Sequence, residues 1–160
     1  MRVQDCLCCP GYPAVGGEYT QKTPGYLSAF GDNTPFSTVK TYFTATTNDI
    51  CFYKKDAAST ATWANAVAKC ADGSYVDAQD KYLGWRLPNL AELGAIQSEY
   101  STLPTQNTSA PGTTAMRTDT YWSSTERSSP NAWRWVYGNN SHAGWYTKNY
   151  GGYYVRCVTI

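Results

Sequence analysis

Residues 121–160 read YWSSTERSSPNAWRWVYGNNSHAGWYTKNYGGYYVRCVTI, and they decide how the rest of the chain is interpreted. The two ends of this stretch, YWSSTE and YVRCV, contain residues that folding fixes, such as Trp122 and Cys157. Between them, most of all over residues 138–154, Asn, Ser, Tyr, Gly and His follow one another without a periodic apolar face. A framed segment with polar, aromatic-rich filling is typical of a binding surface carried by a rigid scaffold.

The same stretch contains short β-strands. Strands are predicted over residues 121–124, 132–137 and 153–159, and residues 145–146 could form another. Residues 138–139 are Gly-Asn, a turn signal between the second strand and the segment that follows it.

Upstream, two strands and two helices are expected. Residues 39–44 (VKTYFT) alternate and are rich in β-branched and aromatic residues, so they predict a strand, and residues 50–53 (ICFY) predict a second one. Residues 59–71 predict a helix that is capped by Ser59 or Thr60 and ends at Asp72-Gly73. One face of this helix is apolar and is made by Trp63, Ala66, Val67 and Cys70.

The second helix starts at Asn89 and runs to about residue 99. Asn89 and Glu92 have the spacing of a capping box, and Pro88 keeps the preceding residue extended. The apolar stripe of this helix is made by Leu90, Leu93 and Ile96. A long polar loop follows over residues 101–119. Strands, two helices, a loop and further strands predict an α+β fold of two helices with antiparallel sheets.

Pro, Gly and Tyr dominate residues 1–38, which predicts an extended arm or connector in front of a domain over residues 39–160. Within this arm lies a cysteine cluster, Cys6, Cys8 and Cys9. Its spacing is poor for zinc, because zinc sites need a second pair of ligands. A disulfide to Cys51, or a link to sequence upstream, remains open.

Composition limits the function classes. The 160 residues carry a net charge of +1 and only 16% are charged, which argues against a partner bound through nucleic-acid phosphates. No apolar run reaches membrane-spanning length, and no apolar segment of a signal peptide follows Met1. The 14 Tyr, 6 Trp and 13 Gly are typical of exported β-rich domains, so we expect a part of a longer exported protein.

Five motifs in order resemble a known family. They are TWANAVAKC (residues 62–70), GWRLPNLAEL (84–93), YWSSTE (121–126), AW (132–133) and YVRCV (154–158). Together they resemble the bacterial Lcl-type C-terminal domain of collagen-like adhesins, which has a C-type-lectin-like fold. This resemblance implies a disulfide between Cys70 and Cys157, while two buried free thiols are the alternative.

The end of the chain also resembles the variable proteins of diversity-generating retroelements. Those proteins display adenine-directed substitutions near the C-terminus of a C-type-lectin-like scaffold, typically from Asn codons. Such codons can give the residues that we call codon-permissive positions: Asn139, Asn140, Ser141, His142, Ala143, Gly144, Tyr146, Asn149, Tyr150, Gly151, Gly152 and Tyr153. The residues that we call frame residues fall outside that rule: Trp133, Trp135, Trp145 and Lys148. An ordinary Tyr- and Asn-rich loop is the alternative.

Signatures of catalysis are weak. His142 is the only histidine, and Ser123 and Ser124 lack the turn that exposes a nucleophilic serine. The WRLP element also resembles formylglycine-generating enzymes, but their late pair of catalytic cysteines is missing. Calcium-dependent sugar binding is in doubt because residues 87–89 (LPN) lack an acid. Glu126 is expected to pair with Arg156, since a buried arginine needs a carboxylate.

We therefore expect a ligand-binding display module of a bacterial or phage surface protein, acting outside the cell or at its surface, without cofactor or metal. Its ligand would be a protein or glycan on another cell or host surface, with neither nucleic acid nor membrane insertion involved. The alternatives are a fixed-specificity adhesin for a glycan or matrix polymer, a structural pilus or virion component and, last, an enzyme. The expected ligand-binding residues are Tyr137, Asn139, Asn140, Ser141, His142, Trp145, Tyr146, Asn149, Tyr150 and Tyr153.

Overall fold

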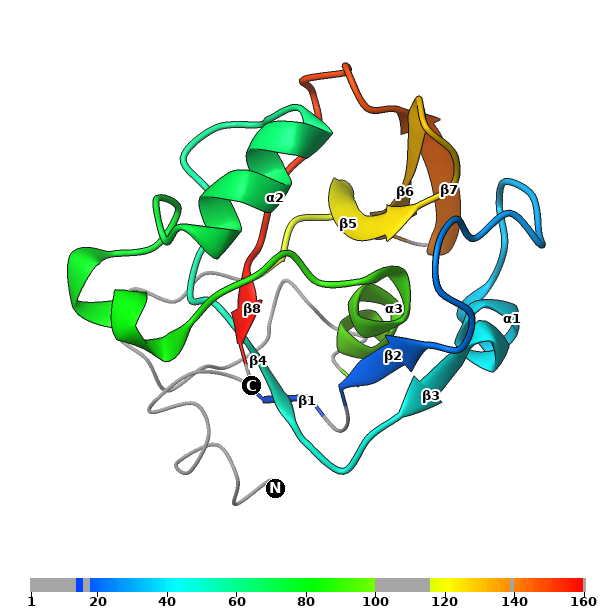
Figure 1. Ribbon diagram of the computed structural model, residues 1–160, viewed down its shortest axis with the longest axis horizontal. Coiled ribbons are helices and arrows are strands. Elements are labelled where there is room, and N and C mark those ends of the chain that lie inside the picture. The colour runs from blue at the N-terminus through cyan, green and yellow to red at the C-terminus, as the bar shows by residue number, and fades with distance from the viewer. Residues whose placement is uncertain (1–13, 16–17, 100–115, 139, 160) are drawn as a thin grey trace.

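The computed structural model describes residues 14–15, 18–99, 116–138 and 140–159. They form an α+β fold with antiparallel sheets (Figure 1). The helices are α1 (Phe36–Val39), α2 (Trp63–Ala71) and α3 (Leu90–Glu99), with 3-10 helices η2 (Lys40–Tyr42) and η3 (Ala78–Leu83). The strands are β1 (Ala14–Val15), β2 (Tyr19–Gln21), β3 (Phe43–Ala45), β4 (Ile50–Phe52), β5 (Thr120–Glu126), β6 (Asn131–Val136), β7 (His142–Thr147) and β8 (Val158–Thr159).

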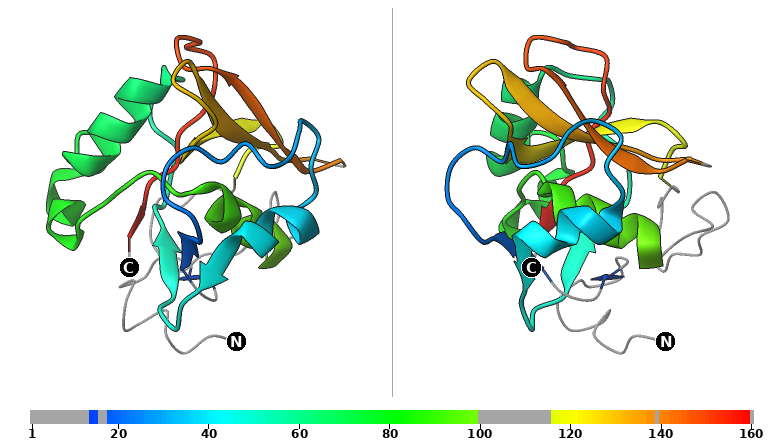
Figure 2. Two further views of the ribbon diagram at one scale, coloured as in Figure 1. Left: turned by 45° about the vertical axis from the view of Figure 1, so that its right-hand side comes forward. Right: turned by 90° about the vertical axis from the view of Figure 1, so that its right-hand side faces the viewer.

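The strands form three small sheets, ordered β1-β4-β8, β2-β3 and β5-β6-β7. The last of these is the largest, and its strands are consecutive hairpins. In the first, β4 pairs on one side with β1, from near the start of the chain, and on the other with β8, from its end. The two views of Figure 2 show the β5-β6-β7 sheet lying apart from the other two.

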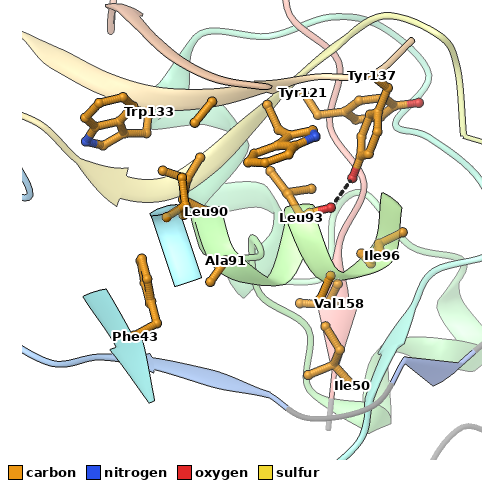
Figure 3. Close-up of a cluster of buried hydrophobic side chains, with 14 of the residues drawn as sticks. Phe43, Ile50, Leu90, Ala91, Leu93, Ile96, Tyr121, Trp133, Tyr137 and Val158 are labelled. Carbon is orange, nitrogen blue, oxygen red and sulfur yellow. Dashed lines mark hydrogen bonds between the residues drawn. The ribbon is translucent and has the colours of Figure 1, made fainter. Parts of the chain in front are cut away.

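Helix α3 lies between the β5-β6-β7 sheet and the β1-β4-β8 sheet (Figure 3). Its predicted apolar stripe is fully buried there, because Leu90, Leu93 and Ile96 are each 0% exposed. Trp133 packs on this helix from β6, and Val158 approaches it from β8. This cluster is the larger of two cores.

A second core lies on the opposite faces of the same strands. In β4, Ile50 and Phe52 point into the first core, while Cys51 belongs to the second. In β5, Tyr121 belongs to the first core and Trp122 to the second. Successive side chains of a strand point to opposite faces, so β4 and β5, which belong to different sheets, each contribute to both cores.

The disulfide that the resemblance implied is present in the second core. Cys70 of α2 and Cys157 are bonded across a sequence separation of 87 residues. The bond ties α2 to the segment that leads into β8. Cys51 is also disulfide-bonded, and Cys6, Cys8 and Cys9, the residues predicted as its partners, lie outside the described residues.

The capping box of α3 is confirmed. The Asn89 N–H donates to Glu92 Oε1 at 2.9 Å, and the Glu92 N–H donates to Asn89 Oδ1 at 3.0 Å. Glu92 also accepts both terminal nitrogens of Arg86 at 2.7 Å and the Tyr19 N–H at 3.2 Å. One fully buried carboxylate therefore satisfies the start of α3 and joins it to β2.

Three predicted boundaries are wrong. Residues 39–42 are helical and the strand begins only at Phe43, because Pro35 opens a helical turn and its carbonyl accepts the Val39 N–H at 3.1 Å. Helix α2 begins at Trp63 after Thr62, whose side chain makes no capping bond. Of residues 153–159 only Val158–Thr159 form a strand, because Tyr153 and Tyr154 bridge to two different segments.

Residues 18–38 pack on the domain. Leu27 is 5% exposed, and its carbonyl accepts the indole N–H of Trp133 at 2.7 Å. The ring of Phe36 lies over Gly94, where an added Cβ would meet its Cδ1 and lie 2.9 Å from its Cε1. Most of the loop predicted over residues 101–119 lies outside the described part of the chain. None of the described helices is long and apolar enough to cross a membrane.

Candidate ligand-binding face

Three of the expected ligand-binding residues form one cluster of rings. Tyr146 lies on β7, and Tyr150 and Tyr153 lie on the segment that follows it. The ring centroids are 5.1 Å apart for Tyr146 and Tyr150, 4.7 Å for Tyr150 and Tyr153, and 5.9 Å for Tyr146 and Tyr153. Tyr146 is 44% and Tyr150 is 42% exposed. We call these three residues the tyrosine cluster.

The backbone beneath the tyrosine cluster is tied at several points. In Figure 1 the segment after β7 crosses from the β5-β6-β7 sheet toward α2. The Lys148 N–H donates to the carbonyl of Pro130 at 2.9 Å, and the Lys148 carbonyl accepts the Trp63 N–H at 3.1 Å. The Tyr153 carbonyl accepts the Ala61 N–H at 3.0 Å. The rings therefore stand on a segment that is fixed at both ends.

Two frame residues, Lys148 and Trp145, hold this segment in place through the following contacts. Lys148 pairs with Glu126 at 2.6 Å, and its ammonium lies 4.5 Å from the centroid of the Trp63 ring. The Trp145 N–H donates to Asp32 Oδ1 at 3.0 Å, and the guanidinium of Arg127 lies 4.1 Å from the centroid of the Trp145 ring.

The outer edge of β7 is paired with the N-terminal part of the chain. Thr34 and Ala143 exchange two backbone hydrogen bonds, of 3.0 and 2.8 Å. Residues near the start of the described chain therefore fix the strand that carries Tyr146.

Tyr153 joins the cluster to the interior. Its ring centroid lies 4.9 Å from that of Trp122, which is fully buried in the second core. Burial raises the pKa of Tyr153, and the nearby positive charge of Arg134 opposes this rise. The ring of Tyr153 therefore packs between the buried Trp122 and the two more exposed rings of Tyr146 and Tyr150.

A second group of expected residues lies at the β6-β7 turn. Asn140 is exposed, while Ser141 and His142 are half-buried. Ser141 Oγ lies 2.9 Å from the carbonyl of Gly138, and His142 Nδ1 lies 2.6 Å from the carbonyl of Asn140. This group stands about 13 Å along β7 from Tyr146, given the rise of a strand. Asn149 is exposed beside the tyrosine cluster, and Asn139 lies outside the described residues.

Tyr137 does not lie on this face. It is 2% exposed, and its hydroxyl donates to the Leu93 carbonyl of α3 at 2.8 Å (Figure 3). Burial holds its pKa well above the usual value. Its position follows from the strand period, because it continues the face of Trp133 and Trp135.

One residue of the face was missed in the sequence. Arg134 lies between Trp133 and Trp135 in β6. Because side chains alternate along a strand, Arg134 points to the face opposite the two tryptophans. Its guanidinium carbon lies 5.4 Å from the centroid of the Tyr153 ring. The pattern Trp-Arg-Trp was the signal that could have found it.

The expected pair of Glu126 and Arg156 does not form. Arg156, whose side chain is 0% exposed, donates from Nε to Asp56 Oδ1 at 2.9 Å, while Glu126 pairs with Lys148. Asp56 also accepts Arg117 Nε at 3.0 Å and the hydroxyl of Tyr121. This network is structural, since it joins the segment before α2 to the end of the chain.

A cavity of about 240 Å³ lies elsewhere, lined in part by Lys55, Ser74, Tyr75 and Asp77. Both Lys54 and Lys55 pair with Asp77, at 2.9 and 3.1 Å, and these hydrogen bonds lower the pKa of Asp77. The charged side chains beside this cavity are therefore paired with one another. Across the described ranges, no three His, Cys, Asp or Glu side chains gather as metal ligands would.

Comparison with known proteins gives one match. A family model described as the Lcl C-terminal domain matches residues 40–159. No curated protein and no solved structure matches the chain.

Proposed function

The chain belongs to the Lcl C-terminal domain family, whose model covers residues 40–159, and from this premise we propose that it is a ligand-binding display module of a bacterial or phage surface protein. The tyrosine cluster is the centre of its binding face. Substitutions directed by a diversity-generating retroelement alter the exposed positions around that cluster. The ligand is a protein or glycan on another cell or host surface, and the module acts outside the cell as part of a longer exported protein.

The proposed architecture is the C-type-lectin-like fold. The bond between Cys70 and Cys157 supports it, because it joins an early helix, α2, to the segment that leads into the last strand. The antiparallel sheets and the two separate cores are compatible with it.

The observation that carries the proposal is the division between permissive and frame residues. Five codon-permissive positions that the structure describes in this region are exposed: Asn140, Tyr146, Asn149, Tyr150 and Gly151. The frame residues Trp133 and Trp135 are buried, and Trp145 and Lys148 are half-buried in the contacts given above. Surface substitutions usually change stability by less than about 0.5 kcal/mol, so the exposed positions can vary while the frame keeps the fold.

Ala143 and Gly144 are codon-permissive but buried. Substitutions there meet packed atoms, so we expect them to be rarer than at the exposed positions. The sequence rule and the structure thus make different predictions for these two residues.

Binding rather than catalysis fits the chemistry of the face. Tyrosine supplies large contact area at low entropic cost, and asparagine and serine supply adaptable hydrogen bonds. The one histidine, His142, lies at the turn, about 13 Å along β7 from the tyrosine cluster.

A pair of randomised libraries tests this proposal. One library varies Asn140, Tyr146, Asn149 and Tyr150 in the full chain. The matched control varies the same number of exposed positions on α2, namely Ala64, Asn65, Ala68 and Lys69. Both libraries are displayed and selected against the same panel of purified, unrelated proteins.

The face library is expected to yield specific binders to several targets while most members stay folded, as measured by protease resistance. The control library is expected to stay folded and yield few binders. Equal yields from both libraries, or loss of folding in the face library, would count against a dedicated display face.

A further inference from the structure

Arg134 is a cation that forms no ion pair within the described part of the chain. Its guanidinium makes no hydrogen bond or ion pair with any residue that the structure describes, and its Nε is buried without a partner. The side chain is half-buried on β6. Within the described ranges its charge contacts one aromatic ring, that of Tyr153, whose centroid lies 5.4 Å from the guanidinium carbon. Arg86, Arg117 and Arg156 differ, since each pairs with a carboxylate. Arg127 resembles Arg134, because its Nε is also buried without a partner and its guanidinium lies over the Trp145 ring.

A glycine makes the space for this guanidinium. A Cβ added at Gly144 would lie 3.1 Å from both Cζ and Nη1 of Arg134. Such contacts are closer than side chains normally tolerate. Gly144 therefore leaves room for the end of Arg134 to lie over β7, beside the tyrosine cluster.

Asp32 lies near Arg134 but forms no ion pair with it. Its Oδ1 would be 2.8 Å from a Cβ added at Gly144, on the same face of Gly144 as the guanidinium. That same oxygen accepts the Trp145 N–H at 3.0 Å. It is thus held by the backbone of β7 rather than by the guanidinium.

We propose that Arg134 is the anchor for a carboxylate on a protein partner, which binds with that carboxylate against Arg134 and an apolar surface on Tyr146 and Tyr150. This deepens the proposed function and rests on it, because it assigns a ligand chemistry to the same face. Arginine binds a carboxylate through two parallel hydrogen bonds, and Nη1 and Nη2 are the donors left when Nε is buried.

A protein fits this face better than a free sugar for two reasons. Tyrosine and arginine are the residues most enriched among energetically dominant contacts between proteins. The rings of the cluster also stand edge to face, with interplanar angles of 85° and 62° for the pairs of Tyr150, so they form a ridge rather than one flat stacking platform.

The test uses a random peptide library displayed on phage and selected on the full chain. Peptides that depend on the face are identified by loss of binding to the Tyr150→Ala variant. Their affinities are then measured by calorimetry for wild type, Arg134→Gln, Arg134→Lys and Gly144→Ala. Lys69→Gln is the matched control, because it removes an exposed cation from α2.

Selected peptides are expected to contain an Asp or Glu that they require. Arg134→Gln should weaken them at least about tenfold, which is the size expected for a charge-assisted pair at an interface. Arg134→Lys should recover part of the loss, and Gly144→Ala should weaken binding by displacing the guanidinium without changing charge. Lys69→Gln should leave affinity unchanged. Replacing the acid by its amide should remove the sensitivity to Arg134.

Thermal unfolding of each variant shows whether a loss of binding comes from a loss of folding. If Arg134→Gln unfolds, the peptide amide series and Gly144→Ala still decide the matter. Face-dependent peptides without a required acid, equally bound by Arg134→Gln, would overturn the inference and leave the proposed function standing. If no peptide depends on Tyr150, both fail. An array of acidic and neutral glycans is the last arm, and Arg134-dependent binding of acidic glycans alone would contradict a protein partner.

Discussion

At the scale of single residues, Asp56 is the carboxylate that pairs with the buried guanidinium of Arg156. Its two oxygens accept bonds from Arg156 at 2.9 Å, Arg117 at 3.0 Å and the hydroxyl of Tyr121 at 2.9 and 3.0 Å. Arg156 has a second partner in the Tyr53 carbonyl, at 3.0 Å. A fully buried guanidinium is tolerated because these acceptors replace water.

We expect Asp56→Asn to lower the free energy of unfolding by about 3–5 kcal/mol, because it leaves the Arg156 charge buried without its counter-ion. Urea unfolding followed by tryptophan fluorescence measures this loss. Asp72→Asn, which removes an exposed carboxylate, is the control and should change stability by less than about 1 kcal/mol. A double variant with Arg156→Met should recover much of the loss, and failure of that recovery would show that Asp56 acts in another way.

Gly94 provides a second test at this scale. Alanine is normally better than glycine in a helix by about 1 kcal/mol, yet a Cβ here would overlap the ring of Phe36. Gly94→Ala is therefore expected to destabilise the protein by about 1–3 kcal/mol, as overpacking does. In a Phe36→Ala background the same change should be neutral or stabilising. Destabilisation that is equal in both backgrounds would mean that residues 18–38 do not pack on α3.

At the scale of elements, separate segments are joined by specific links rather than by long strands. Glu92 links α3 to β2, the pair of Thr34 and Ala143 links β7 to the N-terminal part, and the bond between Cys70 and Cys157 links α2 to the end of the chain. Because β1 and β8 are each two residues long, such links have a large share in fixing the sheets.

Of these three links, the disulfide is expected to contribute most to stability. Replacing Cys70 and Cys157 together by alanine is expected to cost about 2–5 kcal/mol, mainly because the unfolded chain regains freedom over a long loop. Measurement of the unfolding midpoint in the double variant, with the Cys51 disulfide intact, tests this. An unchanged midpoint would mean that the second core holds α2 without the bond.

At the scale of the whole molecule, the β5-β6-β7 sheet lies between the two cores, and the proposed binding face lies beyond the second of them. Burial raises the pKa values of Tyr53, Tyr121, Tyr137 and Tyr153, which pack on or within these cores. Each of them favours the folded state only while it is protonated. The stability that they provide is complete below the ordinary tyrosine pKa of 10.0 and is lost as the pH rises above it.

We therefore expect the unfolding free energy to fall steeply above about pH 10, as the unfolded state ionises its tyrosines and the folded state does not. Urea unfolding at a series of alkaline pH values, with phenolate absorbance recorded in parallel, measures both quantities. Complete ionisation of all tyrosines in the folded state near pH 10 would contradict the burial of these four.

Local patterns predicted the elements whose causes lie close in sequence. The spacing of Asn89, Glu92 and Leu93 was sufficient for α3, and the Gly-Asn turn was sufficient for the β6-β7 hairpin. The pattern at residues 39–42 failed because alternation in so short a segment cannot outweigh a helical start at Pro35. The partner of Arg156 was out of reach, since Asp56 lies 100 residues away in sequence.

The site shows the same division. Tyr146, Tyr150 and Tyr153 were predicted from composition and do lie together. Tyr137 was assigned to the face although the strand period places it with Trp133 and Trp135, and the same period would have revealed Arg134. The gathering of the cluster itself depends on the crossing of the segment after β7 toward α2, which no local pattern encodes.

Sequencing of the 3′ end of this gene across a natural population of its source tests the central claim, a face built to vary, most directly. The proposal predicts that substitutions cluster at Asn140, Tyr146, Asn149 and Tyr150, follow changes available to Asn codons, and spare the frame residues Trp133, Trp135, Trp145 and Lys148. Substitutions at Ala143 and Gly144 should be rarer. If these positions are invariant, or vary no more than α2 and α3 do, the display account is contradicted and a fixed-specificity adhesin replaces it.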